Sequence, residues 1–218
     1  NDVHPTIANA PRWFFTDRSE WLAFSRNGKD IFATRTQDLS GRWSDSLYRI
    51  TIDSSDNDFP TMTWGGSNTQ NNPSLIMLLW ESRHAGNSDI YHSVYNLQNW
   101  SIPAPIASSP GDDRHPHVAA RDSAFAAVWE NGKSIMFSEY RNGVWSSPEF
   151  VTPTGDTTNS MPQVFYTNGF VPRQPLVIWQ KRKIPDTSHA IMFTIRQGTT
   201  WTQPDTVAWS GDNRQPKF

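Results

Sequence analysis

The sequence predicts an all-β fold, a β-propeller built of four-stranded antiparallel blades, with four complete repeats and the first strand of a fifth. Three observations lead to this prediction. A short motif recurs about every fifty residues, and the 218-residue chain is rich in aromatic residues and proline, with 11 Trp, 12 Phe and 16 Pro. In addition, no stretch keeps an apolar face at helical spacing over three turns. Such a composition is typical of short strands joined by tight loops.

The recurring motif is Asp/Asn-x-x-Pro-x-apolar. Its five copies are "DVHPTI" from Asp2, "NDFPTM" from Asn57, "DRHPHV" from Asp113, "NSMPQV" from Asn159 and "NRQPKF" from Asn213. Consecutive motif prolines lie 46 to 56 residues apart. A repeat of this length that contains several short strands indicates a propeller blade, because a single four-stranded sheet cannot bury both of its faces and must stack on its neighbours.

Three landmarks follow the motif in each complete repeat. They are an aromatic residue that ends an apolar stretch (Phe24, Trp80, Trp129, Trp179), an Ile in the next strand (Ile31, Ile90, Ile135, Ile191), and a Trp followed by Ser or Thr that opens the last strand (Trp43, Trp100, Trp145, Trp201). We therefore expect one propeller domain with blades at residues 1–54, 55–110, 111–155 and 156–210, and the start of a further repeat at 211–218. The second-strand tryptophans are predicted to form blade core.

The number of blades in the closed ring stays open at this point. The ring could close with four blades, it could be half of a larger ring completed by a second chain, or its further blades could lie outside this sequence. The last two alternatives are favoured, because the sequence starts and stops at the same landmark of the repeat.

The motif also predicts which residues line the propeller axis. The residue after each motif proline is polar and the next one is apolar, and side chains alternate between the two faces of a strand. We therefore expect the polar set to line a watery axial channel; its members are Thr6, Thr61, His117, Gln163 and Lys217. The motif Asp or Asn is interpreted as a turn former whose side chain bonds backbone amides.

Charge and composition exclude several classes of function. The formal net charge is −2 with both signs interspersed, so neither nucleic acid nor an anionic membrane is an expected partner. Cysteine is absent, which excludes disulfides and thiolate metal sites. The longest apolar run, "SLIMLLW", is far shorter than the ~20 residues that span a bilayer. No cofactor or metal site is predicted, because the histidines are scattered and Asn replaces Asp in three of the five motifs.

Two segments resemble known propeller repeats. "SEYRNGVW" has the Ser, Gly and Trp of the Ser-x-Asp-x-Gly-x-x-Trp box and is similar to the bacterial neuraminidase-type (Asp-box) repeat. "LLWESRHAGNSDIYHS" resembles the strand-turn-strand of TolB-like repeats. The resemblance implies a propeller over nearly the whole chain. It implies little of the family's chemistry, because Tyr140 stands at the Asp of the box and "KRKIPD" lies in a late hairpin loop, where sialidases do not place their Arg-Ile-Pro motif.

Two functions of different class follow. The first is a non-catalytic recognition or scaffold module of a bacterium, secreted or on the cell surface, that binds glycan or protein through loops at one end of the ring. The alternative is a degenerate sialidase-like glycoside hydrolase, although no two acidic residues are paired by the pattern and no catalytic residue is assigned. Aromatic faces flanked by polar groups suit sugar rings, so the candidate ligand-binding residues are Trp13, Trp64, Glu81, Arg83, Glu130, Arg182 and Trp209. Trp13, Trp21, Trp64 and Trp209 are expected to be exposed in connections.

Overall fold

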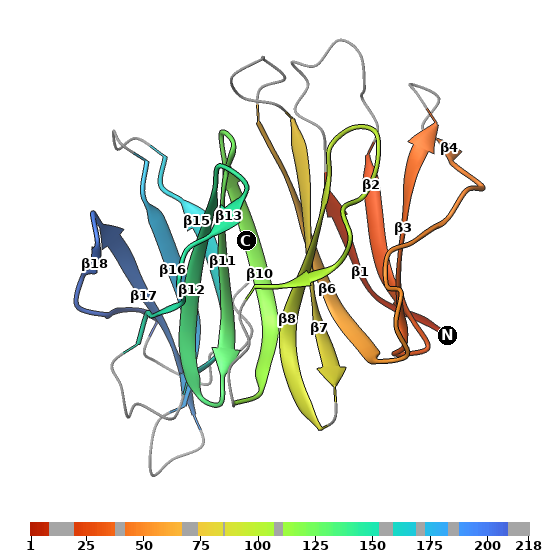
Figure 1. The fold of residues 1–218 in the computed structure, drawn as a ribbon. Coiled ribbons are helices and arrows are strands. Elements are labelled where there is room, and N and C mark those ends of the chain that lie inside the picture. The colour runs from red at the N-terminus through yellow and green to blue at the C-terminus, as the bar shows by residue number, and fades with distance from the viewer. Residues whose placement is uncertain are drawn as a thin grey trace.

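The computed structural model describes residues 1–8, 20–37, 42–66, 74–84, 86–106, 111–152, 159–168, 173–182 and 188–208. These ranges contain nineteen strands and no helix, and the strands pair into four antiparallel sheets that stand side by side (Figure 1). The predicted all-β fold of four-stranded antiparallel blades is confirmed. The expected first strand of a fifth repeat, at 211–218, lies outside the described residues.

The sheets follow the chain in order. Blade 1 comprises β1 (Asp2–Ala8), β2 (Trp21–Arg26), β3 (Asp30–Gln37), β4 (Arg42–Trp43) and β5 (Tyr48–Arg49). Blade 2 comprises β6 (Asp56–Gly65), β7 (Leu75–His84), β8 (Asn87–Tyr95) and β9 (Ala104–Pro105). Blade 3 comprises β10 (Asp113–Arg121), β11 (Ala124–Asn131), β12 (Ser134–Arg141), β13 (Val144–Trp145) and β14 (Glu149–Phe150). Blade 4 comprises β15 (Asn159–Tyr166), β16 (Pro175–Arg182), β17 (His189–Gln197), β18 (Thr200–Trp201) and β19 (Asp205–Ala208).

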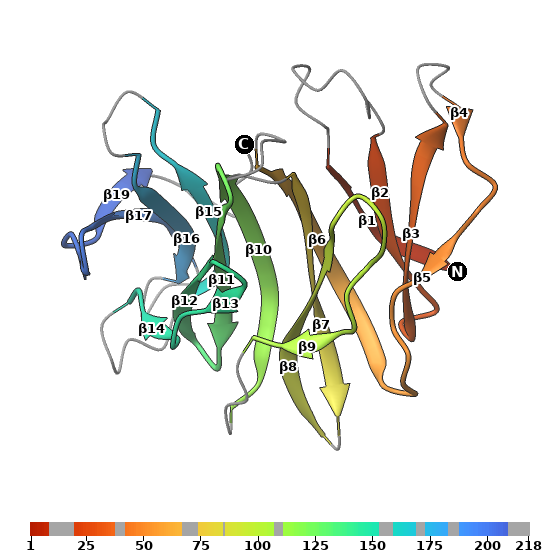
Figure 2. The same cartoon turned by 45° about the horizontal axis from the view of Figure 1, so that its top comes forward.

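Each blade is a four-stranded meander whose outermost strand is interrupted. In blades 1, 3 and 4 two short segments pair in turn with the third strand, for example β13 and β14 with β12. The innermost strands are β1, β6, β10 and β15, and each contacts the next one along the chain (Figure 2). The polar motif positions therefore lie where the four blades meet.

The hydrophobic core consists of three clusters, each shared by two consecutive blades. We call the side of a blade that packs on the following blade its forward face, and the opposite side its backward face. Trp80, Trp129 and Trp179 are almost fully buried on backward faces, as predicted for blade core. On the forward faces, Ile31, Ile90 and Ile135 are also fully buried. Stacking of blades, rather than each sheet alone, thus provides the apolar burial.

The motif proline produces a bulge in every innermost strand. The register shifts between Val3 and Thr6 in β1, and at the matching place in β6, β10 and β15. The residue before each motif proline has a φ close to +50°; these residues are His4, Phe59, His115 and Met161. Proline has no N–H to donate to the ladder, and bulges are where strands accommodate it. A positive φ is costly for a residue with a side chain, so the surrounding packing must hold these four residues in place.

The motif Asp or Asn makes a contact that the sequence did not predict. In blades 2, 3 and 4 its side-chain oxygen accepts a hydrogen bond from the indole N–H of the second-strand Trp. The amide group of Asn57 also donates to the carbonyl oxygen of Lys29, 2.7 Å away in blade 1. The sequence did not predict this indole bond, which ties the first two strands of each of these blades together.

Candidate functional site

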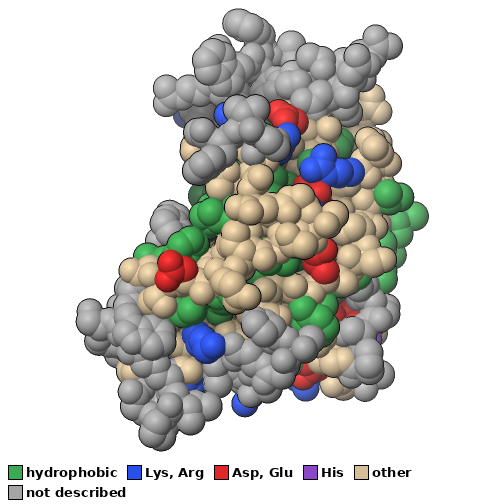
Figure 3. Space-filling view, turned by 90° about the vertical axis from the view of Figure 1, so that its left-hand side faces the viewer, with side chains coloured by type: hydrophobic (Ala, Val, Ile, Leu, Met, Phe, Trp, Pro, Cys, Tyr) green, Lys and Arg blue, Asp and Glu red, His purple; other side chains and the backbone are tan. Residues whose placement is uncertain are grey.

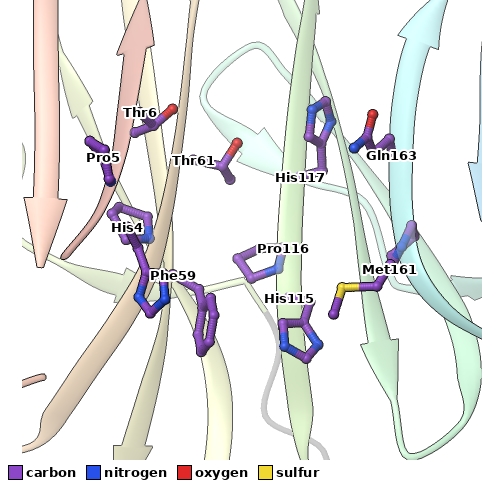
Figure 4. A pocket seen from close by; sticks show the side chains of 12 residues that line it. His4, Pro5, Thr6, Phe59, Thr61, His115, Pro116, His117, Met161 and Gln163 are labelled. Atoms are coloured by element: carbon purple, nitrogen blue, oxygen red, sulfur yellow. The ribbon is translucent and has the colours of Figure 1, made fainter. Parts of the chain in front are cut away.

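The innermost strands line a cavity of about 410 Å³ (Figure 4). Each of the four blades contributes three consecutive residues, centred on its motif proline. The lining residues are 4–6, 59–61, 115–117 and 161–163. The axial cavity is therefore a direct product of the repeated motif.

The lining side chains form two tiers, because the bulge places the residues on either side of the proline at different levels (Figure 4). The upper tier is polar and consists of Thr6, Thr61, His117 and Gln163. The structure brings together these four of the five residues proposed for the channel, while Lys217 lies outside the described residues. The lower tier consists of His4, Phe59, His115 and Met161, which the sequence analysis did not propose.

The lower tier contains a row of rings. The Phe59 ring stacks on the His4 imidazole with centroids 4.3 Å apart, and it meets the His115 imidazole edge to face at 4.9 Å. His4 Nδ1 lies 2.7 Å from Asp58 Oδ1, and the Phe59 amide N–H donates to the same oxygen. Aromatic and imidazole faces from three blades thus border one side of the cavity.

Glu130 supports the lower tier from behind. Its Oε1 lies 2.9 Å from His115 Nδ1 and accepts a hydrogen bond of 2.7 Å from the Met161 amide N–H. The hydrogen bond to Glu130 is the main cause that raises the pKa of His115 above its ordinary value. One carboxylate therefore holds the bulges of blades 3 and 4 together. Glu130 was proposed as a ligand-binding residue, and in the structure it makes these contacts within the protein.

Glu81 occupies the same position in blade 2 as Glu130 in blade 3. Burial raises the pKa of its carboxyl group, although the nearby His115 acts in the opposite direction. Its Oε2 is buried and has no hydrogen-bond partner among the described residues. Neither Glu81 nor Glu130 is among the residues that line the cavity.

His117 is a neutral group in the upper tier. Burial lowers its pKa to about 4. Its Nδ1 accepts a hydrogen bond of 3.2 Å from the Val164 amide N–H, so in the neutral ring the proton is on Nε2. At neutral pH the upper tier therefore offers hydroxyls, an amide and an uncharged imidazole.

The other proposed ligand residues do not join this site. The expectation that Trp64 and Trp21 are exposed was wrong: Trp64 is 8% exposed in β6, and Trp21 is fully buried in β2. Both rings fill the junction between blades 1 and 2, because β6 extends to Gly65 and β2 begins at Trp21. Arg83 and Arg182 are exposed near the ends of β7 and β16, and do not line the cavity. Trp13 and Trp209 lie outside the described residues.

Within the described ranges, no group of three His, Asp or Glu side chains is placed to hold a metal ion. The same part of the chain contains no helix suited to crossing a membrane.

No protein-family profile and no curated protein matches the sequence, but solved structures do match the fold. The chain is similar to the lectin of Aleuria aurantia in complex with α-methyl-L-fucoside, with 13% identity and a TM-score of 0.59, over 88% of this chain and 57% of the lectin. Another structure of that lectin, with a TM-score of 0.57, is described as a six-bladed β-propeller with a novel fucose recognition mode. The fold is that of a β-propeller.

Glycoside hydrolases share this propeller fold. An endo-arabinase from Bacteroides thetaiotaomicron has 14% identity and a TM-score of 0.56, over 94% of this chain and 81% of the enzyme. A GH43 endo-arabinanase from Bacillus licheniformis has 11% identity and a TM-score of 0.53, over 88% and 71%. The chain spans a little over half the length of the lectins that it matches. The neuraminidase-type and TolB-like repeat types stay predictions.

Proposed function

We propose that this propeller is a non-catalytic carbohydrate-binding module, and that its ligand enters the axial cavity. One observation supports this most strongly. The described lining residues combine hydroxyl, amide and neutral imidazole groups with aromatic and apolar surface, and none of them is an acid, an Arg or a Lys. Pockets for neutral ligands share this pattern, in which a few polar groups fix orientation within a mainly apolar lining.

The two tiers match the two kinds of surface on a sugar. A pyranose ring presents C–H groups on its faces and hydroxyls around its edge. The Phe59 and His115 rings offer surfaces for the C–H groups, and the upper tier offers donors and acceptors for the hydroxyls. Because the described lining has no Arg or Lys, and the His115 imidazole is already paired with Glu130, we propose a neutral sugar rather than an acidic one such as a sialic acid.

The state of the nearby acids argues against glycoside hydrolysis. A glycosidase needs two carboxyl groups facing the bound sugar, roughly 5 to 9.5 Å apart, one as acid and one as base or nucleophile. Here Asp58 and Glu130 are each bonded to a histidine, and Glu130 also accepts the Met161 amide. These acids support the wall of the cavity instead of lining it.

The hydrolase alternative rests on Glu81 and is tested separately. A buried carboxyl group with a raised pKa is the kind of group that serves as a general acid. If the chain is a hydrolase, it will turn over a chromogenic glycoside such as a nitrophenyl arabinofuranoside, and Glu81→Gln will abolish that turnover. Under the binding proposal, the protein hydrolyses none of the chromogenic glycosides tested.

The binding proposal is tested by a glycan array followed by calorimetry. We expect binding to neutral glycans, with Gln163→Ala and Thr61→Val each weakening it about tenfold through loss of one hydrogen bond. Gln203→Ala, an exposed amide in blade 4, is the control and leaves affinity unchanged. Folded protein that binds no neutral glycan, or binds it equally well in all three variants, contradicts the proposal.

We further propose that the module is secreted or displayed on the cell surface, where glycans are accessible to it. Fractionation of cells of the source organism, with an antibody to this chain, tests this location. Finding the protein in the cytosolic fraction contradicts it.

A further inference from the structure

The backward face of blade 1 is exposed at a position that is buried in every other blade. The apolar residue two places after the motif proline is only 5% exposed at Met62, 4% at Val118 and fully buried at Val164. The matching residue in blade 1, Ile7, is 54% exposed. The difference arises because blades 2, 3 and 4 each have a preceding blade in the structure that covers this side chain.

The outer-strand tryptophans show the same contrast. Trp100, Trp145 and Trp201 each pack on a ring of the preceding blade, with centroids 5.1 to 5.6 Å from Trp21, His92 and Phe137 respectively. Trp43, at the same place in blade 1, is 41% exposed. A large indole that is covered in three blades and bare in the fourth points to a missing neighbour, not to a surface role of its own.

At the other end of the molecule, the forward face of blade 4 is also incompletely covered. Ile191 is only partly buried, whereas its counterparts Ile31, Ile90 and Ile135 are fully buried. Figure 3 views the molecule from this end, and hydrophobic side chains lie at its surface among polar ones. The four blades therefore end in two unlike faces, each of which is one half of the junction that is repeated three times inside the molecule.

We infer that the backward face of blade 1 is an interblade junction whose partner is another four-stranded blade of this repeat type. That blade would precede blade 1 around the ring, and its forward face would carry small and branched apolar side chains with one large ring, as Trp21, Ala23 and Ile31 do in blade 1. The three existing junctions, all between a forward and a backward face, support this partner. The inference does not depend on what the axial cavity binds.

The test adds a second copy of blades 3 and 4 in front of blade 1. In a fusion protein, residues 111–212, which contain blades 3 and 4, are placed directly before Asp2, so that the motif of blade 1 follows blade 4 at its native spacing. Hydroxyl-radical footprinting with mass spectrometry then measures the oxidation of Trp43. We expect its oxidation rate to fall to that of Trp100 and Trp145, and the melting temperature to rise by at least about 5 °C because apolar surface is buried.

A matched pair of variants separates the junction from general stabilisation. Ile7→Lys should change the melting temperature of the 218-residue chain by no more than about 2 °C, because the side chain is exposed there. In the fusion protein the same substitution should abolish both the gain in melting temperature and the protection of Trp43. Ile102→Lys, at a position that is 79% exposed in blade 2, should have no effect in either protein.

Three outcomes overturn the inference. The first is a fusion protein that folds but leaves Trp43 as reactive as in the 218-residue chain. The second is a fusion protein that does not fold, since two blades of the right type would then not fit this face. The third is a stable dimer of the 218-residue chain in which Trp43 is protected but Ile7→Lys leaves both the dimer and that protection unchanged, because the covering surface would then not be a blade packed on this face.

Discussion

The indole N–H of Trp129 donates a hydrogen bond of 3.0 Å to the carboxylate of Asp113, and both side chains are almost fully buried. The same bond joins the second-strand Trp to the motif Asn in blades 2 and 4. Blade 1 departs at both positions together: Phe24 has no N–H to donate, and Asp2 is exposed and pairs with Arg26. The motif residue and the second-strand Trp therefore act as one unit, which explains why they recur together along the chain.

Removing this N–H should destabilise the protein. Trp129→Phe keeps an aromatic ring but leaves the buried Asp113 carboxylate with one donor fewer, so we expect the free energy of unfolding to fall by about 1.5–3 kcal/mol. The control is Trp145→Phe, because the Trp145 indole N–H has no partner among the described residues. Urea denaturation measures both variants. Equal losses in the two would show that the indole bond contributes nothing beyond ring volume.

His117 should make the protein sensitive to mild acid. Its pKa in the folded state is about 4, against 6.5 for an unperturbed histidine. Between these values the unfolded chain binds a proton that the folded chain does not, so stability is complete above pH 6.5 and falls as the pH drops toward 4. The loss across this window is on the order of 3 kcal/mol.

Comparison with a variant isolates this contribution. In His117→Gln the part of the pH dependence that comes from His117 disappears, while His189→Gln, a histidine outside the cavity, retains it. Chemical denaturation at several pH values from 4 to 7 gives the slopes. If the wild-type and His117→Gln proteins lose stability in parallel, the assignment to His117 is incorrect.

The His115–Glu130 pair should give stability a pH dependence opposite to that from His117. The hydrogen bond to Glu130 raises the pKa of His115, so the protonated imidazole is favoured in the folded state. Its contribution to stability is present below pH 6.5 and is lost as the pH rises through the folded-state pKa. Two-dimensional NMR of the imidazole should show His115 titrating above 6.5, and Glu130→Gln should lower that midpoint. An unchanged midpoint would mean that Glu130 is not the cause.

The sequence predicted the features that depend on the spacing of the repeats and on the alternation of polar and apolar residues along a strand. The spacing of the motif prolines predicted the blades, and the apolar stretches ending in Trp80, Trp129 and Trp179 predicted their core, because the same kind of burial between stacked sheets recurs at each of the three junctions. The alternation of polar and apolar residues after the proline placed Thr61 and its counterparts at the axis, where the structure also places them.

The features that the sequence did not predict depend on contacts between blades and on backbone geometry. A proline within a strand predicts a bulge. It does not predict that the preceding residue has a positive φ and borders the cavity, as Phe59 does, because the packing of four strands around an axis determines both features. Trp64 is not part of the repeated landmarks and was therefore expected to be exposed. It is buried because β6 is long enough to carry it into the junction with blade 1.

The junction between blades 2 and 3 contains the tightest backbone approach among the described glycines and offers a final prediction. A Cβ on Gly65 would lie 2.7 Å from Phe125 Cζ and 3.0 Å from the carbonyl oxygen of Asp122, which also accepts the Gly66 N–H. Gly65→Ala should therefore cost about 1–3 kcal/mol, as overpacking of a closed core does. Phe125→Leu removes the ring atoms concerned, so in that background the added cost of Gly65→Ala should shrink by at least about 1 kcal/mol. Urea denaturation of the two single variants and the double variant completes the cycle. Strict additivity would show that the backbone, not the Phe125 ring, resists the methyl group.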